Sequence, residues 1–149
     1  MAEGGQSSLD EEESDEEIRS LVFLACTGEI TLEQLKKRGD AKLRGKEYQK
    51  GFAIYSIALN CPIMGSTDVT IIAEQLYRKR AECLFKMGKY FEAIKDCEQA
   101  IEIADETNGS SLLSKSLFIK TTAIQNLGDY VNALPFAVWC KHLRPEVIQ

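Results

Sequence analysis

Three lysines are the side chains in this sequence best placed to do chemistry, and the chemistry that they offer is anion recognition. Lys36, Lys79 and Lys115 each fall in a different predicted helix, and an ammonium group donates charge-assisted hydrogen bonds to carboxylates. The alternative is that each is a solvated lysine on a polar helix face, where lysine most often lies. Their placement on one predicted face favours recognition of an acidic partner.

Other side chains accompany these lysines on the predicted face. Phe85, Phe118 and Ile119 add apolar surface, so the face suits a protein or peptide ligand that is acidic and partly apolar. The predicted partner-binding residues are Lys36, Asp40, Arg78, Lys79, Glu82, Phe85, Lys115, Phe118, Ile119 and Thr122.

Catalysis has no comparable support in the sequence, and we do not expect an enzyme. The only histidine, His142, lies near the end of a predicted helix, and the glycines occur singly rather than in a phosphate-binding loop. The cysteines are scattered rather than paired, which predicts reduced core residues, a cytoplasmic or nuclear location, and neither a metal nor a cofactor. They are Cys26, Cys61, Cys83, Cys97 and Cys140.

A recurring phrase defines the elements that must position these residues. Tyrosines at 48, 90 and 130 each follow a glycine closely, at spacings of 42 and 40 residues. Stretches with helical periodicity flank each tyrosine, so the repeating unit is helix, turn, helix. The first pair begins at a capping box formed by Thr31 and Gln34. The predicted helix pairs are 31–44 with 48–60, 69–86 with 90–104, and 111–126 with 130–143.

The N-terminal segment has a different composition from the rest. Eight acidic residues precede Arg19, and the remaining chain holds 18 basic and 15 acidic residues. We expect a disordered acidic tail over 1–15 that either solubilises the chain or competes for the basic face. A short amphipathic helix follows within 16–28, then a repeat domain over 29–145 and a short end, 146–149. We expect neither a signal peptide, because the first residues have no basic region and no apolar core, nor a membrane span, because no apolar run approaches 18 residues.

These residues resemble the tetratricopeptide repeat family. The resemblance implies an all-α, right-handed superhelical solenoid of three helix pairs plus the N-terminal helix. It also implies a concave groove lined by the first helix of each pair, and a non-catalytic adaptor that binds proteins there. Gly51 departs from the family pattern, as does Arg80, which stands where leucine is usual. The small residues expected at close helix crossings are Gly39, Ala58, Ala81, Ala93, Ala100 and Ala133.

One branch of this family, the co-chaperones, is similar in having three repeats, and it grips the C-terminal carboxylates of heat-shock chaperones that end in EEVD. The matching positions hold Lys36, Asp40, Lys79, Lys115 and Ile119, and two of these five keep the side chain of the family pattern. Asp40 would repel a bound carboxylate, and Ile119 supplies no hydrogen-bond donor.

Several readings stay open beside the groove-binding adaptor. One is a co-chaperone that binds a chaperone tail. Another is a structural subunit that uses its outer surfaces. The chain could also self-associate through an uncapped end of the stack. We do not expect nucleic-acid binding, because consecutive basic residues on a helix point in different directions.

Overall fold

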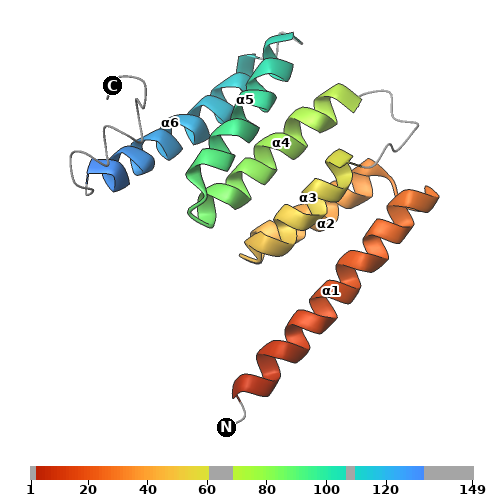
Figure 1. Ribbon diagram of the computed structural model, residues 1–149. Helices are drawn as coiled ribbons and strands as arrows, with labels where there is room; N and C mark the ends of the chain where they lie inside the picture. Colours follow the sequence, from red (N-terminus) through yellow and green to blue (C-terminus); the bar gives the residue numbers. More distant parts are fainter. Residues whose placement is uncertain (1–2, 61–68, 107–109, 133–149) are drawn as a thin grey trace, which may run out of the picture.

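The computed structural model describes residues 3–60, 69–106 and 110–132, and in these ranges every regular element is a helix (Figure 1). The predicted all-α class is therefore confirmed. The six helices in this part of the chain are α1 (Glu3–Thr27), α2 (Leu32–Arg44), α3 (Tyr48–Asn60), α4 (Val69–Lys86), α5 (Tyr90–Glu106) and α6 (Ser110–Asn132).

The first two helix pairs follow the predicted boundaries. The capping box at the start of α2 is present: the Thr31 hydroxyl accepts from the Gln34 amide at 3.2 Å, and the Thr31 amide donates to the Gln34 side chain at 2.9 Å. The turn between α4 and α5 passes through Gly88, whose φ of +79° lies in the left-handed region that glycine adopts without steric cost. Local sequence signals thus determine where these helices begin and end.

The helices stack in the order of the chain. Each of α2 to α5 packs against the next helix along the chain, and α4 also contacts α2 and α6. The first helices of the pairs, α2, α4 and α6, therefore share one layer, while α3 and α5 form the other (Figure 1). This two-layer stack agrees with the expected tetratricopeptide-type solenoid.

Small residues allow the helices to approach closely. A Cβ atom on Gly39 would lie 2.5 Å from the Tyr55 ring, and one on Gly51 would lie 3.2 Å from the Cys83 Sγ atom. Gly51 departs from the family pattern because a larger side chain at this position would crowd Cys83 on the neighbouring helix. Ala133 lies outside the described residues, and the other predicted crossing residues are buried: Gly39, Ala58, Ala81, Ala93 and Ala100.

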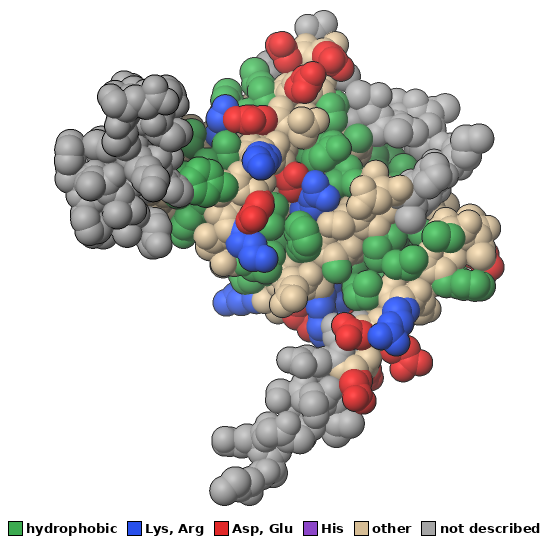
Figure 2. Space-filling model, in the orientation of Figure 1, with side chains coloured by type: hydrophobic (Ala, Val, Ile, Leu, Met, Phe, Trp, Pro, Cys, Tyr) green, Lys and Arg blue, Asp and Glu red, His purple; other side chains and the backbone are tan. Residues whose placement is uncertain are grey.

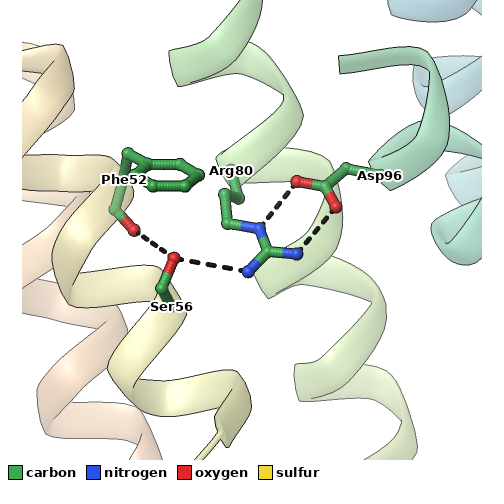
Figure 3. Close-up of polar contacts among 4 residues, drawn as sticks. All are labelled: Phe52, Ser56, Arg80 and Asp96. Atoms are coloured by element: carbon green, nitrogen blue, oxygen red, sulfur yellow. Dashed lines mark hydrogen bonds and ion pairs between the residues drawn. The ribbon is translucent and has the colours of Figure 1, made fainter. Parts of the chain in front are cut away.

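Arg80 joins two repeats (Figure 3). Its guanidinium donates to the two Asp96 carboxylate oxygens on α5 at 2.7 and 2.8 Å, and to the Ser56 hydroxyl on α3 at 3.3 Å. The rings of Phe52 and Tyr77 lie 5.7 and 5.6 Å from its central carbon, within the range of cation–π contact. Arg80 can occupy a position where the family pattern has leucine because its carboxylate partner, Asp96, also lies inside the stack.

The structure differs from the predicted start of the N-terminal helix. Helix α1 begins at Glu3 rather than near residue 16, so residues 3–15 are helical and not irregular. No proline interrupts this segment, and a helix that is nucleated by packing extends readily into adjoining polar residues. The nucleating half packs through Leu21 and Ala25 into the core cluster that α2 and α3 also form, and Glu17 pairs with Lys42 at 3.2 Å.

The predicted turn before Tyr130 is wrong. Helix α6 continues from Ser110 through Gly128 to Asn132. A glycine inside a helix costs only about 1 kcal/mol relative to alanine, which the flanking helical residues can offset. The rest of the predicted partner helix, 133–143, and the predicted insert at 63–68 lie outside the described residues.

Candidate functional site

A cleft of about 460 Å³ between α4 and α6 brings together six of the ten predicted binding residues. This volume is in the range of known ligand sites, about 300 to 1,000 Å³. We call it the α4/α6 cleft, and its lining residues are Glu82, Phe85, Lys86, Ser114, Lys115, Phe118, Ile119 and Thr122.

Two aromatic residues give the cleft its apolar character. Phe118 on α6 is 73% exposed, which is the largest exposure among the large apolar residues of the described part. Phe85 on α4 is half-buried and packs edge-to-face on Tyr90 at 5.6 Å, so its ring is held in place. The cleft therefore combines one aromatic ring that is packed in place, Phe85, with one that is exposed to solvent, Phe118.

Cationic groups flank these rings. Lys86 ends α4 and Lys115 lies in the second turn of α6, and both are exposed. Neither forms an ion pair with another described residue, whereas Glu82 places one carboxylate on the same lining. The cleft can thus donate hydrogen bonds to an acidic ligand while its rings contact apolar groups.

Lys36 and Asp40 lie elsewhere, in what we call the Asp40 cluster, with Tyr55 and Lys79. Lys36 Nζ donates to Asp40 Oδ2 at 2.9 Å, and the Tyr55 hydroxyl donates to Asp40 Oδ1. Burial alone would raise the pKa of Asp40. The hydrogen bonds from Tyr55 and Lys36, together with the charge of Lys79, outweigh burial and hold that pKa below its ordinary value of 3.8. Asp40 is therefore ionised at neutral pH.

Glu82 connects the Asp40 cluster with the α4/α6 cleft. Glu82 lines the cleft. Burial is the main cause that raises the pKa values of Tyr55 and Cys83, and the negative charge of Glu82 adds to it. The predicted residues other than Arg78 therefore fall in two neighbouring groups along α2, α4 and α6, the helices of one layer.

Arg78 does not take part in either group. Its Nε donates to Glu74 Oε1 at 3.1 Å, and the residue is only 9% exposed. Glu74 lies one turn earlier on α4 and is fully buried, so the guanidinium is needed to compensate an interior carboxylate. The prediction that Arg78 contacts a partner is not supported by this arrangement.

Lys86 and Ser114 line the cleft but were absent from the predicted set. Lys86 follows Glu82 by four residues, and a spacing of four places two side chains on one helix face. That spacing was the signal available in the sequence for Lys86. Ser114 had no comparable signal, because a serine on a helix carries no charge or apolar surface to single it out.

The described part of the chain has no cluster of His, Cys, Asp and Glu side chains that could hold a metal ion. Burial raises the pKa values of the Cys83 and Cys97 thiols to about 12, which disfavours the nucleophilic thiolate. His142, Cys61 and Cys140 lie outside the described residues. None of the described helices is long and apolar enough to cross a membrane.

On the face that Figure 2 shows, basic, acidic and apolar side chains are interspersed over the coloured part of the surface. A nucleic-acid surface usually presents a broader basic stripe. The coloured surface in this view shows no such stripe.

Comparison with known proteins gives the family. Residues 74–107 match the tetratricopeptide repeat model, so its matched unit spans α4 and α5. Protein unc-45 homolog B of Mus musculus is 31% identical over 113 residues, 76% of this chain and 11% of that protein. Sperm-associated antigen 1 of Mus musculus is 31% identical over 100 residues, 66% of this chain and 10% of that protein.

A third relative, Hsp70-Hsp90 organizing protein 2 of Arabidopsis thaliana, is 31% identical over 90 residues, 60% of this chain and 14% of that protein. The chain spans about a tenth of the length of the first relatives that it matches. No solved structure matches it significantly. The repeat model, these relatives and the stacked helix pairs agree, and the chain belongs to the tetratricopeptide repeat family.

Proposed function

We propose that this chain is a non-catalytic adaptor that binds an acidic, partly apolar segment of a partner protein in the layer of α2, α4 and α6. We call it the concave layer, because the family resemblance predicts that it lines the groove. Membership of a protein-interaction repeat family supports an adaptor in general. The observation that carries the finer proposal is the α4/α6 cleft, where Phe118, at 73% exposure, stands beside Lys115.

The composition of the cleft supports this choice of partner. An exposed aromatic ring that becomes buried on binding is the kind of residue that dominates interface energies. Lys86 and Lys115 would supply charge-assisted hydrogen bonds to nearby carboxylates of the ligand. Because the cleft opens to solvent beside exposed Phe118 and is lined by two helices, a polypeptide segment is the ligand that we favour.

Binding of a heat-shock chaperone tail is a second candidate. It is favoured by the similarity to Hsp70-Hsp90 organizing protein 2 and by Lys36 and Lys115, which match the clamp of the co-chaperone branch. The ion pair between Lys36 and Asp40 weighs against it, because that lysine already has a carboxylate partner at 2.9 Å.

A structural subunit that uses outer surfaces is a third candidate. Apolar side chains outside the cleft support it, namely Phe23 on α1, 63% exposed, and Ile124 on α6, 49% exposed. A cytoplasmic or nuclear location fits all three candidates, and the unpaired thiols of Cys26, Cys83 and Cys97 support it.

Peptide display tests the proposal. A random library is selected on the immobilised wild-type chain, and the enriched peptides are then measured for binding to Phe118→Glu and to the matched control Phe23→Glu, which alters an equally large exposed ring on α1. We expect acidic peptides with apolar residues, and at least about a tenfold loss of affinity for Phe118→Glu alone, because a charge replaces an aromatic ring that the bound peptide would bury.

The double variant Lys36→Ala/Lys115→Ala separates binding in the concave layer from binding on outer surfaces, since only the former should weaken markedly. If Phe23→Glu abolishes binding while Phe118→Glu leaves it unchanged, the partner binds an outer surface and the proposal fails.

A further inference from the structure

The two groups of charged residues in the concave layer differ in how their charges are compensated. In the Asp40 cluster the carboxylate takes hydrogen bonds from Lys36 at 2.9 Å and from the Tyr55 hydroxyl. In the α4/α6 cleft, Lys86 and Lys115 have no carboxylate partner among the described residues. A ligand carboxylate therefore meets at one end of the layer a lysine that already has a carboxylate partner, Lys36, and at the other end two lysines without one.

Asp40 is held firmly in its position. The Tyr55 side chain is fully buried, and its ring lies so close to Gly39 that a single methyl group there would clash at 2.5 Å. The phenol therefore cannot swing away, and its hydroxyl remains directed at Asp40. With only 18% of its side chain exposed, Asp40 also has little access to solvent.

The charges around Asp40 partly compensate one another. The charges of Lys36 and Lys79 favour its ionised form, while Glu82 adds a second negative charge that acts on Tyr55 and Cys83. Asp40 thus offsets part of the positive charge of the two lysines. An incoming carboxylate would therefore gain less attraction there than beside lysines without a partner, and it would lie close to Asp40, which has the same charge.

We propose that Asp40 is a specificity determinant that closes the α2 side of the concave layer to carboxylates, so that the chain binds an internal acidic and apolar segment through the α4/α6 cleft and requires no free C-terminal carboxylate. This inference rests on the proposed function, and it defines the chemistry of the partner: an internal segment of a polypeptide rather than its terminus.

A pair of matched peptides tests the inference. Two fluorescein-labelled dodecapeptides share one sequence that ends in Glu-Glu-Val-Asp, and one has a free C-terminal carboxylate while the other has a C-terminal amide. Their dissociation constants are measured by fluorescence anisotropy for the wild type, for Asp40→Asn and for Glu102→Gln. The last variant removes one exposed carboxylate from α5 and so controls for net charge.

We expect the wild type and Glu102→Gln to bind the two peptides with affinities within about twofold of each other. Asp40→Asn keeps an acceptor for the Tyr55 hydroxyl and frees Lys36, so it should bind the free acid at least about tenfold more tightly than the amide. Circular dichroism establishes that each variant is folded.

Two results would overturn the inference. One is a preference of the wild type for the free acid by about fivefold or more, a measurement that needs no substitution. The other is a folded Asp40→Asn variant that gains no preference for the free acid. Neither result bears on whether Phe118 anchors a selected peptide, so failure here is distinguishable from failure of the proposed adaptor function.

Discussion

Replacement of Asp96 by alanine should destabilise the stack strongly, because it leaves Arg80 without its counter-ion between two repeats. The substitution removes both acceptors of a bidentate ion pair whose N–O distances are 2.7 and 2.8 Å. The Arg80 side chain is 19% exposed and that of Asp96 is 9% exposed, so water can replace the lost acceptors only in part.

The size of this effect lies between two limits. Removing one partner of a fully buried pair costs about 3 to 5 kcal/mol, whereas exposed pairs contribute about 0 to 1 kcal/mol. Arg80 keeps its bond to Ser56, its contacts with two rings and some contact with solvent. We therefore expect Asp96→Ala to lower the free energy of unfolding by about 2 to 3 kcal/mol.

The neighbouring repeat supplies the control. Lys120 on α6 pairs with Glu98 on α5 at 3.6 Å, but their side chains are 30% and 54% exposed. Glu98→Ala should therefore change the free energy of unfolding by less than about 0.5 kcal/mol.

Urea denaturation followed by circular dichroism measures these differences. A double-mutant cycle with Arg80→Leu and Asp96→Ala should give a coupling energy of about 2 kcal/mol, because the double variant leaves no uncompensated charge. A coupling below about 0.5 kcal/mol, or equal costs for Asp96→Ala and Glu98→Ala, would refute the reasoning that burial makes this pair important.

Three further predictions concern other parts of the stack. Gly39→Ala should lower the free energy of unfolding by about 1 to 3 kcal/mol in urea denaturation, because its Cβ would clash with the Tyr55 ring; an unchanged midpoint would show that the ring can shift. The pKa of Asp40 is lowered in the folded state, so its contribution to stability is present above its ordinary pKa of 3.8 and is lost as the pH falls through the lower folded value. Acid titration of wild type and Asp40→Asn should therefore show a steeper loss for the wild type below about pH 4, and parallel curves would contradict this. Among the three described cysteines, exposed Cys26 should react with iodoacetamide in the folded protein, while the buried thiols of α4 and α5 should react only in denaturant, as peptide mapping by mass spectrometry would show.

The helix pairs could be predicted because their signals are local. The capping box at Thr31, the glycine turn at Gly88 and the apolar periodicity of each helix all act within a few residues along the chain. The same local reasoning failed where packing or cooperativity decides the outcome. Helix α1 extends to Glu3 and α6 continues through Gly128 because a helix that is already formed adds residues at little cost.

The candidate site was predicted in part for the same reason. Helical spacing placed Phe85, Phe118 and Lys115 on faces that do meet in one cleft. It could not distinguish Arg78, which pairs with a buried glutamate, from Lys79, which forms no ion pair with another described residue. Adjacent residues on a helix differ by about 100° in direction, so a small rotation of α4 decides which of them is buried.

The sequence by itself determined that this chain is a stack of helical hairpins with basic and aromatic residues on their first helices, since the period of apolar residues and the caps are properties of neighbouring residues. Only the tertiary structure decided which charges are already compensated. Asp40 and Tyr55 lie 15 residues apart, and Arg80 and Asp96 lie 16 apart. Such pairs form only when separate helices pack, so their partners depend on the crossing of the helices rather than on spacing along the chain.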